Sequence, residues 1–443
     1  MTSDIFFKKM ETLKSSYLQE LYRRGFLNQV SNLVEMDDIL YKKEAEYKSD
    51  RDNYEPTVLY CGFDLTADSL HIGHMIPLLM LEIGVKYGHR PIILLGGGTS
   101  KIGDPTGRDK ERPLIDKKEL QENYIGIKKS IEKIFPTVKT ADISKDKIDK
   151  KSLTPLLANN EDWLSSLFYI DFLSTIGSVV SVKRMLGMES AKKRMSGDGS
   201  YSFLEFNYML LQGYDFYYLS KTIGCSIQCS GQDQWGNSVI GIDIISKLLK
   251  KPSFVMTSPL LETSNGVKMS KSSGLSIWMN DIEDDGCKTS SSYEIYQFFI
   301  NCEDEVVDDY INLFIGKGID GDRNIIERKT YLALELVSLL RGEKESCKMK
   351  EFARDIYKNK ILDPKAIEIT VESPQNLHSI LVKNDILSSR GEVKRFIKNG
   401  GIKHYNIIEN NKLGDETIFT NDEELVQSGI QISIGKKTKI KIL

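Results

Sequence analysis

The sequence lacks a long hydrophobic run, which argues against a membrane-spanning protein. No stretch of about 18 consecutive apolar residues, the length a helix needs to cross a bilayer, occurs in the 443 residues. The N-terminus mixes Asp4, Glu11 and Glu20 with its lysines, unlike a secretory signal or a transit peptide. We expect no membrane partner and favour a cytoplasmic location, and an organelle matrix is also compatible with the sequence.

The sequence also has few cysteines and a small net charge. The six cysteines are scattered, without the two-residue spacing of zinc and redox motifs, which indicates reduced thiols. Cys225 and Cys229, four residues apart in GCSIQCSG, lack further ligands at metal spacing, so they are predicted to be buried in a strand. With 60 basic and 63 acidic side chains the net charge is -3, so a nucleic-acid partner must contact local patches.

The chain is long enough for two or three domains, and its hydrophobic pattern changes along its length. In residues 1–280, three β-rich apolar runs, TVLYCGF, PIILLGGG and CSIQCSG, alternate with helical patterns such as His74 to about Tyr87. This alternation predicts an α/β fold, a Rossmann-like domain with a parallel sheet whose ligands bind at the carboxyl ends of its strands.

The remaining stretches are predicted to be helical or small. Residues 114–207 are mostly helical and expected as an insertion between two halves of the sheet, and residues 281–368 form an all-helical domain. Residues 371–443 combine helices with β-like runs, which predicts a small α+β module. The charged segment from Tyr41 to Pro56 is most simply a solvated loop or a helix extension.

The C-terminal module is locally basic in a chain that is net negative. From Gln375 onward there are 11 Lys or Arg and 8 Asp or Glu, and Arg390, Lys394 and Lys398 repeat along one helix face beside Arg395. Such a stripe is compatible both with a solvated face and with a surface that binds RNA. Its place in a small separate module favours RNA.

Two of the five histidines, His71 and His74, stand three residues apart where a helical pattern begins, in DSLHIGHMIPLL. They could form half of a metal site, but no further ligands occur at metal spacing and zinc is disfavoured. A helix N-terminus instead offers N–H groups and the positive end of the helix dipole to phosphate. Gly62 and Gly73 leave room for a ligand near the backbone, so both histidines are predicted to donate hydrogen bonds to phosphate oxygens.

Two more motifs carry charge that suits a phosphate ligand. GGGTSKIGDPTGR does not fit the P-loop pattern, but it places Asp104 beside a glycine-rich turn, with Arg108 and Arg112 on the polar loop that follows. GVKMSKSSG carries Lys268 and Lys271, which by itself is also typical of an exposed loop. Together with the upstream HIGH, the two lysines are predicted to close over a triphosphate and stabilise the charge on departing pyrophosphate.

HIGH at residues 71–74 and KMSKS at residues 268–272 resemble the two signature motifs of class I aminoacyl-tRNA synthetases. Five further segments resemble bacterial-type tyrosyl-tRNA synthetases, in the same order and over nearly the whole chain: YCGFDLTADSLHIGH, IGDPTGR, NNEDW, YMLLQGYDF and SGQDQWGN. The C-terminal SSRGEVKRFIKNGGI resembles an RNA-binding module first seen in a ribosomal small-subunit protein. Ser100 and Lys101 depart from the family's glycine and apolar residue, and KMSKS replaces the common KFGKT with both lysines kept.

The resemblance implies which residues bind tyrosine and ATP. Tyr60 and Asp215 would hold the phenolic hydroxyl, and phenylalanine would leave both groups unpaired, a discrimination for which tyrosyl-tRNA synthetases are themselves the standard example. The other positions that match tyrosine-binding residues are Asp64, Asp104, Tyr208, Gln212 and Gln228. The positions that match ATP or adenylate contacts are Cys61, Gly62, His71, Gly73, His74, Asp233, Gln234, Lys268 and Lys271.

The resemblance also implies the reaction. The carboxylate of tyrosine attacks the α-phosphate of ATP in line, with Mg²⁺ held by the phosphates and water, and without a nucleophilic side chain, a resident metal or a prosthetic group. The residues expected to stabilise the phosphates are His71, His74, Lys268, Lys271, Arg108 and Arg112. The tyrosyl-adenylate then esterifies the terminal adenosine of tRNA(Tyr).

By the same resemblance, residues 1–280 are the catalytic domain, residues 281–368 an anticodon-side helical domain, and residues 371–443 the RNA-binding module. The basic residues expected to contact RNA in that module are Arg390, Lys394, Arg395 and Lys398. A homodimer is implied, with its interface on the helical insertion.

Other interpretations of the sequence alone remain open. A tryptophanyl-tRNA synthetase shares HIGH and KMSKS, but it would not be expected to pair Tyr60 with Asp215 around a phenol. A catalytically silent RNA-binding relative would keep the C-terminal module while losing signature residues, and both signatures are intact. Without the motif, the aromatic-rich helix that carries Tyr208 and Asp215 reads as core, and packing alone also explains Cys61.

Overall fold

The computed structural model describes residues 12–106, 115–196, 201–261, 277–282, 284, 287–318, 323–359, 366–408, 412–435 and 438–443. The chain divides into two compact units, Met1–Gly342 and Glu343–Leu443, and each is described by itself. Within the described ranges, every helix is too short or too polar to cross a bilayer.

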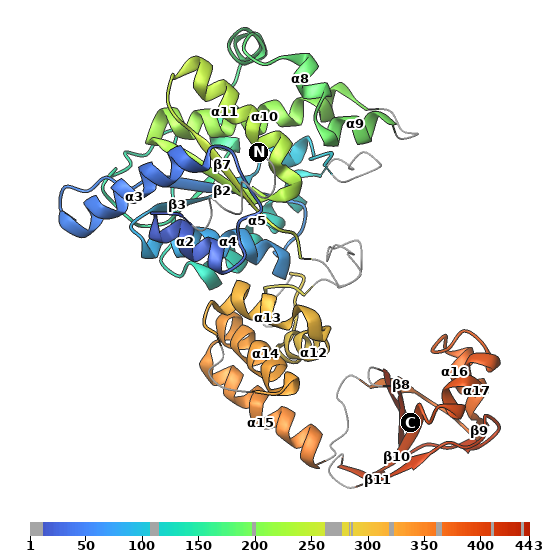
Figure 1. Cartoon of the computed structure of the whole chain (residues 1–443). Helices are drawn as coiled ribbons and strands as arrows, with labels where there is room; N and C mark the ends of the chain where they lie inside the picture. The colour runs from blue at the N-terminus through green and yellow to red at the C-terminus, as the bar shows by residue number, and fades with distance from the viewer. Residues whose placement is uncertain are drawn as a thin grey trace. The chain divides into compact units, whose positions relative to one another are not determined.

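A seven-stranded sheet forms the centre of the first unit (Figure 1). Its strands in spatial order are β1 (Gln29–Val30), β7 (Phe254–Ser258), β6 (Cys225–Gly231), β2 (Val58–Asp64), β3 (Arg90–Gly96), β5 (Leu156–Asn159) and β4 (Lys139–Thr140). All neighbours are parallel except β1 and β7. The predicted α/β fold with a predominantly parallel sheet is confirmed, and the three apolar runs singled out in the sequence are β2, β3 and β6.

The strand order reverses at β2. The chain runs outward from β2 through β3 to β4 and β5, and it then returns to place β6 and β7 on the other side of β2. Such a reversal leaves a crevice at the carboxyl ends of the two strands that flank it, which is where α/β proteins bind their ligands. The candidate site is therefore expected where β2 ends at Asp64 and β6 ends at Gly231.

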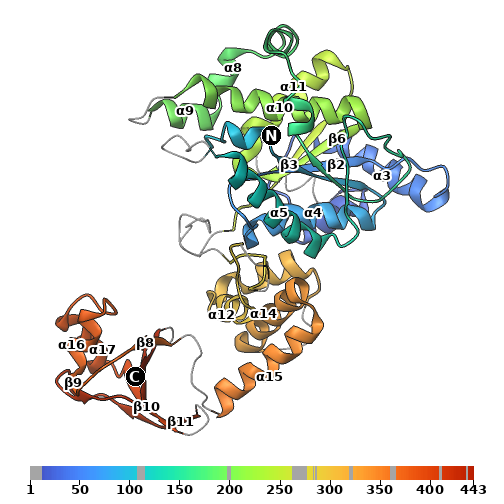
Figure 2. The same cartoon turned by 180° about the vertical axis from the view of Figure 1, so that it is seen from behind.

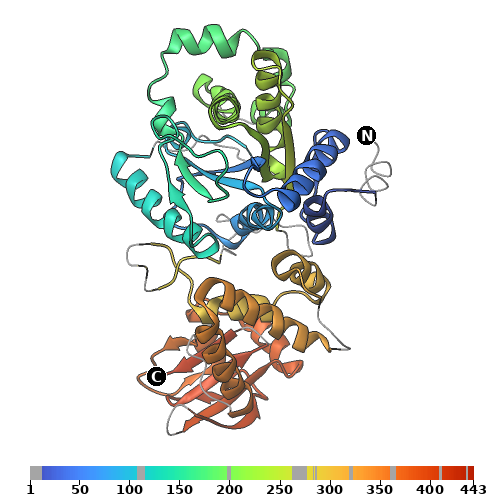
Figure 3. The same cartoon turned by 90° about the vertical axis from the view of Figure 1, so that its left-hand side faces the viewer.

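Helices cover both faces of this sheet (Figures 2 and 3). On one face Tyr60 of β2 packs against Phe216 of α10, with ring centroids 5.3 Å apart. On the other face α4 approaches so closely that a Cβ on Gly84 would lie 2.8 Å from Leu59 Cδ1. Successive strand residues point to opposite faces, so Tyr60 and Leu59 assign α10 and α4 to opposite layers. The principal helices around the sheet are α2 (Ser16–Arg23), α3 (Leu33–Ser49), α4 (Ile72–Lys86), α5 (Lys117–Ile134), α10 (Phe203–Ile223) and α11 (Trp235–Leu248).

The predicted helical insertion, residues 114–207, differs from the structure in one respect. Just over half of its described residues are helical, in α5, in the short helices α6 (Glu161–Leu164), α7 (Tyr169–Phe172), α8 (Val182–Leu186) and α9 (Glu189–Ser196), in a π-helical turn at Leu173–Gly177 and in the start of α10. It also supplies β4 and β5 to the sheet, and β5 pairs with β3 from Ile92 to Leu95. The sequence did not predict these strands, because a run of four residues carries too little periodicity.

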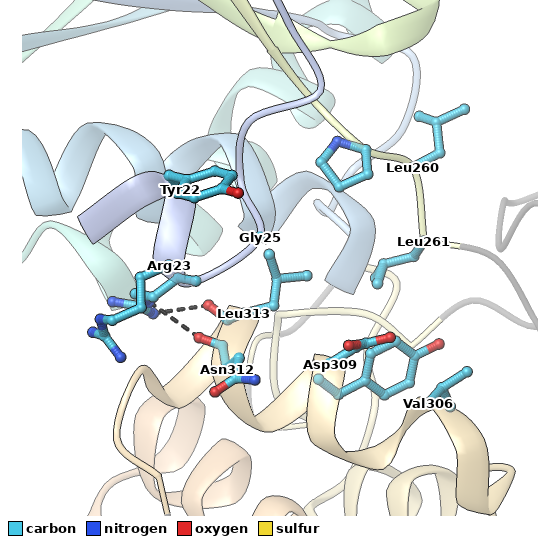
Figure 4. Close-up of a pocket in the computed structure, with 12 residues that line it drawn as sticks. Tyr22, Arg23, Gly25, Leu260, Leu261, Val306, Asp309, Asn312 and Leu313 are labelled. Atoms are coloured by element: carbon cyan, nitrogen blue, oxygen red, sulfur yellow. Dashed lines mark hydrogen bonds between the residues drawn. The ribbon is translucent and has the colours of Figure 1, made fainter. Parts of the chain in front are cut away.

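The first unit ends in a helical part made of α12 (Ser292–Ile300), α13 (Val307–Tyr310) and α14 (Ile325–Arg341). Arg24, which follows α2, ties it to the sheet part by donating to the carbonyl oxygens of Asn312 and Leu313 at 3.2 and 2.8 Å (Figure 4). Beside these contacts lies a cavity of about 410 Å³. The residues that line it include Tyr22, Leu261 and Leu313 and none of those predicted from the sequence to bind a ligand.

The second unit is a helix followed by a small α+β fold. Its helices are α15 (Glu343–Asn359), α16 (Leu377–Lys383) and α17 (Arg390–Lys398). A five-stranded sheet has the order β11 (Lys412–Ile418), β10 (Ile402–Ile408), β13 (Ile430–Ile434), β14 (Thr438–Ile442) and β8 (Ile367–Ile369), and β9 (Gln375–Asn376) pairs with β12 (Leu425–Val426). Its core joins apolar residues of the sheet to Leu377, Leu381 and Val393 from α16 and α17.

The charged segment from Tyr41 to Pro56 largely continues α3, and one of its acids is not solvated. Glu44 is 2% exposed and accepts hydrogen bonds from Ser15 Oγ at 2.5 Å and from the backbone N–H groups of Ser16 and Tyr17 at 2.7 and 3.1 Å. The N–H groups of Ser16 and Tyr17 are among the backbone donors that a helix N-terminus leaves without intrahelical partners. Glu44 on α3 therefore caps the N-terminus of α2. Burial acts to raise the pKa of Glu44, but contacts with His89, Ser15 and these N–H groups outweigh it and lower the pKa.

Glu44→Gln is expected to lower the free energy of unfolding by about 1–3 kcal/mol at pH 7, because an amide NH₂ would then face donors. A carboxyl whose pKa is lowered by folding stabilises the fold above its unfolded pKa, and loses this effect as pH falls through the folded value. The difference between wild type and variant should therefore be constant from pH 7 down to about pH 5 and shrink as the pH falls below the ordinary glutamate pKa of about 4.5. Urea unfolding measures it, with Glu46→Gln at the exposed partner of Lys43 as the control. An equal loss in both variants would contradict the capping role.

Candidate active site

Within the described ranges, several of the residues predicted to bind a ligand lie at the crevice between β2 and β6. Tyr60 and Gln228 are neighbours in the parallel register of these strands, and both are buried. Gln228 Oε1, Tyr60 Oη and Gln212 Oε1 of α10 are buried polar atoms for which the described residues provide no hydrogen-bond partner. Buried polar groups are rarely left unpaired in proteins, so three such atoms in one region indicate that a ligand supplies their partners.

Asp215 on α10 is the charged group of this region. It is 3% exposed, and its two carboxyl oxygens accept hydrogen bonds from Asn160 Nδ2 at 2.9 Å and Trp163 Nε1 at 2.8 Å. Burial raises the pKa of Asp215 to about 7, the two hydrogen bonds act in the opposite direction, and the charge of Asp64 adds to the rise. Burial and the charge of Asp215 also raise the pKa of Tyr60 well above its ordinary value. A carboxyl that titrates near neutral pH thus lies within electrostatic reach of an unpaired phenol.

The sequence predicts no role for Asn160 and Trp163, although NNEDW, which contains both, resembles a segment of the family. Asn160 follows β5 directly, and besides Asp215 it contacts Thr99 Oγ1 at 3.1 Å and accepts from Gly98 N at 2.8 Å. One side chain therefore orients both the carboxyl group and the glycine-rich turn after β3. The only sequence feature that could have indicated these roles is the pair Asn159–Asn160 shortly before Trp163. Its meaning depends on β5, which the sequence does not predict.

The glycine-rich turn is fixed by contacts that leave no room for side chains. Asn159 Oδ1 accepts from Gly97 N at 3.1 Å, and a Cβ on Gly97 would lie 2.3 Å from that oxygen. The two positions that depart from the family pattern follow at once. Ser100 Oγ accepts from Leu65 N at 2.7 Å, and Lys101 forms an ion pair with Glu161. Both departures therefore contribute ties between this turn and its neighbours.

Two further sets of predicted residues meet at the ends of the strands. Asp64 accepts from Tyr208 Oη at 2.9 Å and from Thr99 Oγ1 at 2.8 Å. Asp104, 7% exposed, accepts from Gln234 Nε2 at 2.7 Å and from Thr106 N at 3.0 Å. Each carboxylate is thus held in place by at least two donors, as a group that orients a polar ligand requires.

His71 and His74 lie together at the start of α4. His71 Nδ1 accepts from Gly73 N at 3.1 Å, His74 Nδ1 accepts from His71 N at 3.4 Å, and the rings stack with centroids 3.8 Å apart. A neutral imidazole that accepts at Nδ1 carries its proton on Nε2, so each ring presents an N–H donor at the other end. The two histidines therefore cap the helix and are also suited to donate to an anion.

The remaining predicted positions are divided. Gly62 is exposed, and a Cβ there would meet no atom within 4 Å, so the backbone at the end of β2 is open to a ligand. Cys61 beside it is 3% exposed, and burial raises its pKa. Asp233 lies in the turn after β6, next to Gln234. Four predicted residues fall outside the described ranges: Arg108, Arg112, Lys268 and Lys271.

The basic stripe of the C-terminal unit is partly neutralised within α17 and its surroundings. Arg390 donates to Asp422 Oδ2 and Glu423 Oε1, both at 2.5 Å, and Arg395 lies 3.4 Å from Glu392. Lys394 and Lys398 are exposed on the same helix. The structure therefore points to the two lysines, more than to Arg390, as the cations that this face offers to a partner.

Comparison with known proteins agrees with this geometry. Residues 51–358 match the family described as tRNA synthetases class I (W and Y). The chain is 38% identical to the tyrosine–tRNA ligase of Wolbachia pipientis over 97% of its own length and 98% of the relative's. It is 35% identical to that of Rickettsia bellii, over 96% and 99%.

A solved structure points the same way. A C-terminally truncated mitochondrial tyrosyl-tRNA synthetase from Aspergillus nidulans superposes with a TM-score of 0.60 and 26% identity, covering 79% of this chain and 96% of that one. These relatives favour the tyrosine branch over the tryptophan alternative. The chain therefore belongs to the class I tRNA synthetases of the W and Y family and, within them, to the tyrosine–tRNA ligases.

Proposed function

We propose that the chain carries out the ligase reaction in two steps, with the crevice between β2 and β6 as its active site. Tyrosine and ATP first give tyrosyl-adenylate and pyrophosphate, and the tyrosyl group is then transferred to the 3′-terminal adenosine of tRNA(Tyr). The observation that carries this proposal is the unpaired, buried hydroxyl of Tyr60 in the field of the buried carboxyl of Asp215. A phenol both donates and accepts a hydrogen bond, so it can pair with both groups.

The residues around the pocket suit the other parts of the substrate. Gln212 and Gln228 offer unpaired acceptors for its α-amino group, and Asp64 and Asp104 bring negative charge near it. The N–H donors of His71 and His74 at the N-terminus of α4 favour the phosphates of ATP, which brings Mg²⁺ with it. No side chain acts as nucleophile, because the carboxylate of tyrosine attacks the α-phosphate, and the protein contributes position and charge.

Exchange of labelled pyrophosphate into ATP tests this function, with tyrosine, tryptophan and phenylalanine compared at equal concentrations. Exchange is expected with tyrosine alone, because phenylalanine would leave Tyr60 and Asp215 unpaired. Exchange with tryptophan alone would assign the pocket to the other branch of the family. Folded protein without exchange would favour the silent RNA-binding alternative, for which direct binding of tRNA is the next measurement.

Trp163→Phe tests the role of Asp215. The indole N–H lowers the pKa of this carboxyl, so its removal should raise that pKa further. If the ionised carboxylate accepts the phenol O–H, tyrosine binding is lost as pH falls through this pKa, and in the variant the loss begins at higher pH. The pH profile of kcat/KM for tyrosine shows it. Tyr218→Phe, which alters the ring stacked on Trp163 at 4.7 Å, is the control, and a shift of equal size there would exclude this explanation.

We further propose a homodimer whose interface includes the surface near α7 and α8. Large apolar side chains are exposed there, with Phe168 at 76%, Ile170 at 72% and Val182 at 58%. Three consecutive exposed large apolar side chains, as at residues 168–170, are typical of protein interfaces. Phe168→Glu combined with Ile170→Glu should give a monomer in sedimentation experiments. Ile326→Glu, on α14 and 68% exposed, should leave the dimer intact. A variant that stays dimeric would place the interface elsewhere.

The second unit is proposed to contact tRNA through Lys394 and Lys398. The proposed location of the protein is the cytoplasm. Both exposed lysines lie on α17 within a compact fold, which supports a local electrostatic contact in a chain of net charge -3.

A further inference from the structure

The turn that carries His71, at the start of α4, is hydrogen-bonded to a segment that lies outside the proposed substrate site. Residues 277–281 run beside the turn that precedes α4. Met279 N donates to Leu70 O and Ile72 N donates to Ile277 O, both at 2.8 Å, and Trp278 forms a β-bridge with His71. The backbone on both sides of His71 is thus hydrogen-bonded to this segment.

Asn280 fixes the segment to the core of the first unit. It is 0% exposed, its Oδ1 accepts from Ser130 Oγ at 2.8 Å, and its Nδ2 donates to Gly126 O at 2.9 Å and Asp68 O at 3.3 Å. Ser130 Oγ in turn accepts from Leu70 N at 3.1 Å. A Cβ on Gly126 would lie 1.8 Å from Asp68 O, so the contact has no space for another residue. Asn280 therefore joins α5 to the turn that carries His71.

Arg341, the last residue of α14, fixes the same segment from the helical part. Its guanidinium donates to the carbonyl oxygens of Met279 at 2.6 Å, Asn280 at 2.9 Å and Ser290 at 2.7 Å. Its Nε lies 3.1 Å from Asp281 Oδ2, and the side chain is 1% exposed. The guanidinium also donates to the carbonyl oxygen of its neighbour Leu340 at 3.0 Å. A buried guanidinium that donates to four separate carbonyl groups is a rigid junction, since each of its donors has a fixed direction.

We propose that Asn280 and Arg341 are positioning residues for the activation step, which act by setting the place of His71 and His74. The proposal rests on the phosphate role given to these histidines in the proposed function. It means that α14, in the helical part, contributes to the reaction with ATP even when no tRNA is bound. Neither residue belongs to the described tyrosine pocket, whose residues come from β2, β6, α10 and the β5–α6 turn.

The test compares Arg341→Ala and Asn280→Asp with wild type by pyrophosphate exchange. Asn280→Asp keeps the acceptor for Ser130 but turns the Nδ2 donor into an acceptor that faces two carbonyl oxygens. Both variants are expected to lower kcat about 10-fold or more while the KM for tyrosine changes less than about 2-fold, since small displacements of catalytic groups are costly to rate. Arg341→Lys, which keeps the charge beside Asp281, should recover part of the lost rate.

Arg90→Ala is the matched control. Arg90 is also a buried arginine, 5% exposed, and donates to two carbonyl oxygens, those of Thr154 at 3.1 Å and Asp149 at 2.6 Å, but it lies at the start of β3, at the opposite end of the sheet. It should lose stability in thermal unfolding without a comparable loss of kcat. Unchanged kcat in folded Arg341→Ala and Asn280→Asp, or an equal loss in Arg90→Ala, would overturn the proposal. Wild type without tyrosine-dependent exchange would instead refute the proposed function.

Discussion

The carboxyl group of Asp215 has to be buried and yet hydrogen-bonded, and the arrangement of the sheet edge around it follows from this requirement. An isolated buried carboxylate is strongly unfavourable, so its donors must come from rigid neighbours. Asn160 comes from the end of β5 and Trp163 from the helix that begins one residue later, because β5 pairs with β3. Asn160 also holds Gly98, so the orientation of the acid and the shape of the glycine-rich turn are fixed by one side chain.

The same backbone groups provide stability and function at the start of α4. The Nδ1 atoms of His71 and His74 accept hydrogen bonds from N–H groups that a helix N-terminus leaves unpaired. In each neutral ring the proton is therefore on Nε2. A substitution of either histidine therefore removes a cap as well as a donor. Loss of activity alone cannot separate the two effects, so the variants proposed above leave the histidines in place and alter what holds them.

The sequence predicted the parts of the fold that have long apolar runs and not the parts that depend on contacts. β2, β3, β6 and α4 were found, because seven or more residues of one pattern give a clear signal. β5 was missed because it has four residues, and with it the roles of Asn160 and Trp163. The sequence places Glu44 in a segment expected to be a solvated loop or a helix extension, since nothing in the local pattern reveals that the N-terminus of α2 lies against it. Polar residues acquire their function from partners far along the chain.

The contribution of β5 to the central sheet bears on how such a protein can change. Residues 114–207 look in sequence like a removable module, inserted between two halves of a domain. Since β5 pairs with β3 and is followed directly by Asn160, an exchange of this stretch between relatives would carry part of the amino-acid pocket with it. Specificity for the side chain of the amino-acid substrate and the sequence of this insertion should therefore change together in evolution. A chimaera with an insertion from another relative would need new hydrogen-bond donors for Asp215.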